Sequence, residues 1–263
     1  MPKKWSKLEE EGKRKELVSL YVKDNKTIGE TADILGLAES SVFERLIRLR
    51  IKPRRSKKLR YNNRNFKVVL PKEYSSELAE FIGILLGDGH LTPTQVTITL
   101  GKKDEYVGRV IRLVEKLFKV KPKCITSIRG DNVIYFGSTA AARWLISMGL
   151  VFNKVKAQVD IPSWCFSNKK IMRAVIRGLF DTDGSVYKLR FGTQISFCNR
   201  SRPLLKSVRL MLFKLGFRPS EISGYNVYLT RRSDLHRFMK EIGFGNKKHS
   251  KRFLVFTGGW VSS

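Results

Sequence analysis

The feature that most constrains this chain is an internal repeat, because one order of predicted elements occurs twice after about residue 70. The first copy predicts helix 76–87, strand 94–100, helix 104–118, strands near 123–129 and 132–137, and helix 138–148. The second predicts helix 168–181, strand 187–198, helix 201–215, strands 218–223 and 225–230, and helix 232–242. The exits match as well, since Gly149 leads to Asn153-Lys154 and Gly243 leads to Asn246-Lys247. We therefore expect two pseudo-symmetric halves in one chain.

The first helix of each copy carries small residues on one face and ends at Asp-Gly. Gly83 and Gly87 are four residues apart, as are Gly178 and Thr182, so each pair shares a helix face and allows two helix backbones to approach closely. The glycine after each aspartate is expected to adopt the positive φ of a helix end. Close packing of the two helices would bring Asp88 and Asp183 side by side.

Two adjacent carboxylates repel each other, and burial makes the charged pair costly. A bound cation removes that cost, and Mg²⁺ prefers such hard oxygen ligands. Metal at this site could activate water and stabilise a leaving oxygen, which is the chemistry of phosphodiester hydrolysis. A single Asp-Gly would be read as a helix cap or turn. Two copies in matching positions favour a metal site.

Both segments, residues 81–89 and 176–184, resemble the LAGLIDADG motif of homing endonucleases, and the resemblance covers about residues 72–256. The first motif departs from the family lettering at Phe81, Leu86 and Gly87 but keeps Asp88. The second motif also has Asp181, which we expect to cap or pair locally and not to bind metal. The resemblance implies an α+β fold of two αββαββα repeats, whose antiparallel strands form a saddle over DNA.

The resemblance also implies a set of site residues. The predicted metal site comprises Asp88 and Asp183 with the adjoining Gly87 and Thr182, and it would hold Mg²⁺, or Mn²⁺, or Ca²⁺ without turnover. Basic or polar side chains beside the metal would orient water and offset charge on the cleaved phosphate. The repeat places these at Lys102, Asn199, Lys154 and Lys247, with Lys156, Lys248 and Lys251 as competitors in the same loops.

The charge balance indicates a polyanionic partner. The chain has 52 Lys and Arg against 23 Asp and Glu, a formal charge of +29, which a globule has no internal reason to carry. Membrane attachment is not expected, because no long apolar run or basic amphipathic anchor is present. We see no signal peptide, and three scattered cysteines indicate neither disulfides nor zinc. A cytoplasmic or nucleoid location is expected, and an organellar origin stays open.

Residues 8–51 predict three short helices, with Thr27 as an N-cap and Gly36 closing the second helix. This pattern favours a helix-turn-helix domain over residues 1–52, although a helical cap on the neighbouring domain is the alternative. The polar face of its third helix carries Ser40, Ser41, Arg45 and Arg48. Residues 53–71 predict a basic linker in which Arg54 and Arg55 contact phosphates. The repeats are assigned to 72–167 and 168–263, the second with a basic C-terminal tail.

Strand alternation supplies a second set of candidate DNA contacts. Polar positions are expected on one face of each sheet and apolar positions on the other, although a sheet face exposed to water alone would also be polar. The predicted DNA-binding residues are Gln95, Thr97, Thr99, Lys188, Arg190, Gln194, Ser196, Arg218, Asn226, Tyr228, Thr230, Arg231 and Arg232. In this prediction Lys188, Arg190, Gln194 and Ser196 share one face, opposite Leu189, Phe191, Ile195 and Phe197.

The sequence thus predicts a site-specific, Mg²⁺-dependent double-strand DNA endonuclease of intron-homing type. We expect it to act as a monomer on a long target site. The alternative is a non-cutting DNA-binding regulator or an RNA-splicing maturase on the same scaffold. Both aspartates are retained, which favours the enzyme. The endonuclease of a self-splicing intein is not expected, because the chain lacks an N-terminal nucleophile and a terminal His-Asn.

Overall fold

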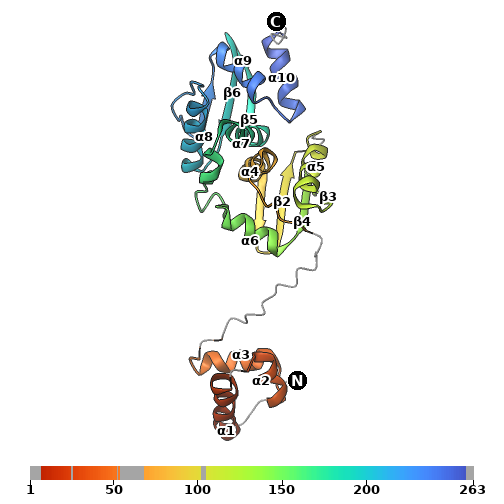
Figure 1. The fold of residues 1–263 in the computed structure, drawn as a ribbon, viewed down its shortest axis with the longest axis vertical. Helices are drawn as coiled ribbons and strands as arrows, with labels where there is room; N and C mark the ends of the chain where they lie inside the picture. Colours follow the sequence, from red (N-terminus) through yellow and green to blue (C-terminus); the bar gives the residue numbers. More distant parts are fainter. Residues whose placement is uncertain (1–6, 25, 52, 54–67, 102–104, 259–263) are drawn as a thin grey trace. The chain divides into compact units, whose positions relative to one another are not determined.

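The computed structural model describes residues 7–24, 26–51, 53, 68–101 and 105–258. The chain divides between Asn62 and Asn63 into two compact units, each with its own hydrophobic core (Figure 1).

The smaller unit is helical. Helix α1 spans Lys7–Val18 and continues as the π-helical turn η1 over Ser19–Lys23, followed by α2 at Ile28–Leu35 and α3 at Glu39–Arg48. Thr27 caps α2 through a capping box, in which its hydroxyl accepts from the Glu30 amide while its own amide donates to the Glu30 carboxylate. Gly36, with φ of 63°, ends α2. The short helices agree with the sequence pattern, and their use on DNA stays a prediction.

The larger unit contains the repeat. Its first half consists of α4 (Ser76–Asp88), β1 (Gly89–Thr92), β2 (Gln95–Leu100), α5 (Val107–Phe118), β3 (Lys123–Thr126), β4 (Asn132–Gly137) and α6 (Thr139–Ser147). After the 3₁₀ turn η2 (Ser163–Phe166), the second half consists of α7 (Lys169–Thr182), β5 (Gly184–Leu189), β6 (Gly192–Cys198), α8 (Arg202–Lys214), β7 (Asn226–Leu229), α9 (Arg232–Glu241) and α10 (Lys247–Thr257).

The strands form two antiparallel sheets, with orders β1-β2-β4-β3 and β5-β6-β7. Helices of each half contact the sheet of that half, and α4 and α7 lie side by side between the two sheets (Figure 1). Val96, Ile98 and Phe136 are buried on the helix-covered face of the first sheet, as are Ile195, Phe197 and Val227 on that of the second. The predicted α+β fold is confirmed.

Three element predictions are wrong. The strand expected at 94–100 is present as β2, although β1 before it was not expected, whereas the single strand expected at 187–198 is two strands, the end of β5 and all of β6, joined by a turn. Residues 218–223 form only one isolated bridge, between Ser223 and Asn226. The expected basic tail instead contains α10, where His249, Phe253 and Thr257 recur every fourth residue and are buried.

Candidate functional site

The site is built on backbone contact between α4 and α7. A Cβ on Gly83 would lie 3.0 Å from the Leu179 nitrogen and would overlap the Val175 carbonyl oxygen. A Cβ on Gly178 would lie 2.9 Å from the Ile84 nitrogen and would overlap the Glu80 carbonyl oxygen. No side chain larger than hydrogen fits at either position, so these glycines set the distance between the two helices.

The same contact continues to the ends of both helices. A Cβ on Gly87 would lie 2.8 Å from Thr182 Cβ and 3.5 Å from Asp183 Cγ. Gly87 and Thr182 therefore face each other one residue before the two aspartates. Asp88 is the last residue of α4, and Asp183 is the C-cap of α7.

The positive φ expected for the glycines after the aspartates is wrong. Gly89 has φ of −82° and ψ of 155°, and Gly184 is likewise absent from the positive-φ glycines. Glycine is needed for a different reason, because the chain turns back over its own helix into a strand. A Cβ would lie 2.5 Å from Leu85 Cα at Gly89, and 2.7 Å from Phe180 Cα at Gly184.

Asp183 is held in a defined orientation. Asn199, which follows β6, donates from Nδ2 to Asp183 Oδ2 at 2.7 Å. Burial raises the pKa of the Asp183 carboxyl, while the Asn199 hydrogen bond and the positive charge of Lys154 act in the opposite direction. The predicted site residue Asn199 therefore lies at the aspartate pair and contacts one member of it.

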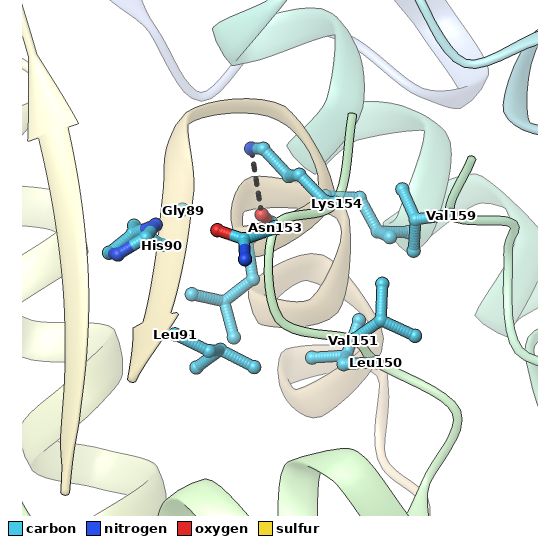
Figure 2. A pocket seen from close by; sticks show the side chains of 10 residues that line it. Gly89, His90, Leu91, Leu150, Val151, Asn153, Lys154 and Val159 are labelled. Carbon is cyan, nitrogen blue, oxygen red and sulfur yellow. Dashed lines mark hydrogen bonds between the residues drawn. The ribbon is translucent and has the colours of Figure 1, made fainter. Parts of the chain in front are cut away.

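Lys154 lies close enough to both aspartates for their charges to influence its pKa. Its Nζ donates to the carbonyl oxygen of Gly87 and, at 3.2 Å, to that of Leu85, at the end of α4. Burial lowers the pKa of Lys154, and the negative charges of Asp183 and Asp88 oppose that shift. The lysine also lines a small pocket with His90, Leu150 and Asn153 (Figure 2).

The lysine expected to be the symmetry partner of Lys154 does not occupy an equivalent place. Lys247 is exposed, and its Nζ lies 3.8 Å from Glu105. The reason is a difference in loop length: Lys154 is five residues after Gly149, whereas Lys247 is four residues after Gly243 and begins α10. Lys102 lies outside the described residues. The centre is therefore asymmetric, with one lysine among the described candidates at the aspartates.

Asp181 binds backbone groups at the start of α10. Its carboxylate accepts the backbone N–H groups of Gly245 and Asn246, each at 2.9 Å, which fixes the start of α10. Burial raises the pKa of Asp181 to about 7. The buried Glu80 carboxylate of α4 binds Arg109 at 2.7 Å and lies 3.6 Å from Arg177 of α7. These ion pairs therefore link the two halves.

The strand register defines a polar face on each sheet, opposite the helices. In the first sheet Thr97 pairs with Tyr135 and with His90, and Gln95 and Thr99 lie on the same face. In the second sheet the face contains Gln194, Cys198, Asn226 and Tyr228. We call these two surfaces the polar sheet faces.

The expected alternation in the β5–β6 hairpin is wrong. Tyr187 is opposite Gln194, whereas Lys188 is opposite Thr193, so Lys188 and Gln194 lie on different faces. The reason is the two-residue turn at Arg190 and Phe191, which reverses the chain and changes the phase of alternation. Ser196 lies on the polar sheet face, but it is only 4% exposed between Ser185 and Tyr228.

Two side chains on these faces were missed by sequence reasoning, namely Tyr135 and Tyr187. Tyr135 alternates with the buried Ile134 and Phe136, which is a signal that the sequence does contain. The sequence contained no signal for Tyr187, because the position of the β5–β6 turn decides which sheet face this side chain lies on.

The remaining predicted contacts are at the surface. Arg218, Thr230, Arg231 and Arg232 are exposed around β7 and the start of α9. In the smaller unit Ser40 and Arg48 are exposed, while Arg45 folds back to the Ser41 carbonyl at 3.1 Å. Arg54 and Arg55 lie outside the described residues.

Two helices that meet through glycines, end in paired aspartates and lie between two antiparallel sheets define a LAGLIDADG-type arrangement. Residues 170–243 match the family model described as a LAGLIDADG-like domain. These residues, which include the second motif, are therefore similar to a LAGLIDADG-like domain, and the expected resemblance to that family is confirmed.

Curated relatives are similar over part of their length. The chain is 28% identical to the replication factor C small subunit of Methanocaldococcus jannaschii over 194 residues, which is 69% of this chain and 10% of that protein. It is 26% identical to a DNA polymerase of Thermococcus hydrothermalis over 207 residues, which is 71% of this chain and 12% of that protein. The match spans about a tenth to a fifth of these relatives.

Solved structures with a similar chain include I-DmoI in complex with DNA and Ca, at 17% identity and a TM-score of 0.45, covering 64% of this chain and 88% of that one. The N-terminal LAGLIDADG domain of DUF199/WhiA matches at 17% and 0.48, covering 65% and 84%. The homing endonuclease I-WcaI, bound to its DNA recognition sequence, matches at 12% and 0.48, covering 79% and 96%. Separately, among the helices of the described segments, none combines the length and hydropathy that a membrane crossing requires.

Proposed function

We propose that this protein is a site-specific DNA endonuclease that cleaves both strands at a single metal-dependent centre formed by Asp88 and Asp183. The observation that carries the proposal is the Lys154 ammonium group, which donates to the Gly87 carbonyl oxygen at the end of α4 and lies within electrostatic range of both carboxylates. Asp88 at the end of α4 and Asp183 at the end of α7 thus lie near the same ammonium group.

The donor set fits a hard divalent cation. Two carboxylates and the Gly87 carbonyl offer oxygen ligands, which Mg²⁺ prefers. The described residues hold no group of three or more His, Cys, Asp or Glu side chains placed for a metal ion. Water, or oxygens of a bound phosphate when DNA is present, would fill the remaining ligand positions of a cation here. When bound, such a cation supplies an activated water and charge stabilisation at the leaving oxygen.

The protein's own residues divide the remaining work. Asn199 acts as a positioning residue, because it orients the carboxylate of Asp183 and leaves the other oxygen available. Lys154 places a positive charge where the negative charge of a cleaved phosphate would develop. The Thr182 and Gly87 contact keeps the two aspartates at a fixed separation.

The polar sheet faces supply a surface for the duplex. Gln95, Thr97 and Asn226 can donate to and accept from base edges, and a formal charge of +29 favours phosphate contact along the whole molecule. Because both halves of the centre are in one chain, we propose that a monomer is sufficient for cleavage.

A cleavage assay with separated strands tests the proposal. The protein is incubated with a library of candidate sites and Mg²⁺, and both product ends are sequenced. Asp88→Asn and Asp183→Asn should each abolish double-strand cleavage or leave nicking alone, while chelator should stop cutting and leave DNA binding largely intact. Normal cutting by either variant would contradict the assignment, and binding without cutting by the wild type would favour a non-cutting regulator.

A further inference from the structure

Lys154 is the half-buried cation of the candidate centre, and its hydrogen-bond partners are unusual for a lysine in a loop. Its Nζ donates to the Gly87 and Leu85 carbonyl oxygens, which belong to the last turn of α4. Helix carbonyls at this end carry partial negative charge, so a cation is stabilised there. Asp88 and Asp183 add two full negative charges.

The same atoms are the candidate ligands of a divalent cation. The Gly87 carbonyl oxygen and both carboxylates would form its protein ligands; Lys154 donates to the carbonyl oxygen and lies within electrostatic range of the two carboxylates. An ammonium group and a divalent cation cannot occupy such a space together, because both positive charges would be poorly screened.

We infer that Lys154 is a tethered cation that holds the metal site closed in the metal-free chain and sets its affinity for divalent cations. The inference rests on the proposed metal site, and it goes beyond a role for Lys154 in the reaction. Lys154 must withdraw from the Gly87 carbonyl before the site can accept a metal ion. The energy of that withdrawal is subtracted from the affinity of the aspartate pair.

The loop that carries Lys154 can allow such a withdrawal. Asn153, directly before the lysine, has a positive φ of 50°, and Val155 and Lys156, directly after it, are exposed. The side chain also borders the small pocket beside His90 and Gly89 (Figure 2).

The test measures Mn²⁺ affinity in the full chain without DNA, by electron paramagnetic resonance of the free ion. Lys154→Met removes the charge and the donor, and Lys154→Gln removes the charge but keeps a donor for the carbonyls. Both variants should bind Mn²⁺ roughly tenfold tighter than the wild type, because a competing unit charge has been removed. Lys206→Met, which removes an exposed lysine of α8, is the matched control and should leave the affinity unchanged.

A second measurement separates this effect from a loss of folding. Without metal, the Lys154 variants should unfold at a lower temperature, because the two carboxylates then repel without compensation. Saturating Mn²⁺ should raise their unfolding temperature more than that of the wild type, since tighter binding stabilises more. If Lys154→Met fails to fold, Lys154→Gln carries the same two measurements.

The failures are distinguishable. In one outcome, Asp88→Asn and Asp183→Asn abolish Mn²⁺ binding, but both Lys154 variants bind Mn²⁺ no tighter than the wild type. That result would overturn the tethered-cation role and leave the proposed function standing. If Asp88→Asn and Asp183→Asn both bind Mn²⁺ as tightly as the wild type does, the proposed metal site is wrong, and so is the inference that rests on it.

Discussion

Gly83 and Gly178 lie where the backbones of α4 and α7 touch, and a methyl group has no space at either position. We expect Gly83→Ala to lower the free energy of unfolding by about 1–3 kcal/mol or more, because overpacking forces the two helices apart. Urea denaturation followed by circular dichroism measures the change.

Gly108→Ala is the control for this prediction. Gly108 also lies in a helix, and its nearest neighbour beyond the local backbone, an Arg112 guanidinium nitrogen, is 3.5 Å from the added Cβ. Alanine there should be neutral or stabilise by roughly 0.5–1 kcal/mol, because it restricts the unfolded chain. Equal effects of the two substitutions would show that the contact between α4 and α7 is not tight.

At the same scale, the sequence contained enough to predict that α4 and α7 pack closely with Asp88 and Asp183 at their ends, because small residues at four-residue spacing favour close helices. It did not contain the unequal positions of Lys154 and Lys247. One residue fewer between Gly243 and Lys247 rotates that side chain toward Glu105, and a repeat comparison by residue order does not register such a change.

At the scale of elements, the two exposed cysteines can test which sheet face the proposed DNA substrate covers. Cys198 is exposed on the polar sheet face of β6, whereas Cys124 is exposed on β3 opposite the buried Ile134 and so on the other face. Cys165 is buried, and burial raises the pKa of its thiol well above the usual range.

We expect two thiols to react quickly with a thiol reagent and one to react slowly, because reactivity follows the exposed thiolate. Bound duplex DNA should protect Cys198 and leave Cys124 reactive. Mass spectrometry of labelled peptides assigns each site. Protection of Cys124 with continued labelling of Cys198 would place the DNA on the opposite face and contradict the saddle.

Helices and strands were predictable where the spacing of apolar residues was regular. The predictions were wrong where a turn interrupted that spacing. Helices α4, α7 and α9 follow the expected ranges closely, since their apolar positions recur regularly. The β5–β6 hairpin was missed because Arg190 and Phe191 have no strong turn signal before Gly192. Helix α10 was missed because its lysines resemble a solvated tail, although Asn246 as an N-cap precedes a buried four-residue repeat.

At the scale of the whole molecule, the unit before Asn63 is separate from the unit that holds the aspartates. A chain shortened to residues 63–263 should therefore retain cleavage chemistry and lose DNA affinity. Each lost phosphate contact removes close to one unit of the salt dependence, so the shortened chain should show a shallower slope of log affinity against log salt.

Filter binding at several salt concentrations and a nuclease footprint measure this prediction. The footprint should shrink at one end only, because the chain has a single added module and a pseudo-symmetric larger unit. An unchanged footprint and salt slope would mean that the helices of the smaller unit do not contact DNA and serve as a cap.

The backbone contact at Gly83 and Gly178 also has a consequence for the products of cleavage. The separation of Asp88 and Asp183 depends on main-chain atoms of α4 and α7, whereas target choice depends on side chains of the two sheets. On the proposed function, the stagger between the two broken strands is then a fixed property of the helix pair. Changes that redirect the protein to a new target should leave every product with the same overhang length.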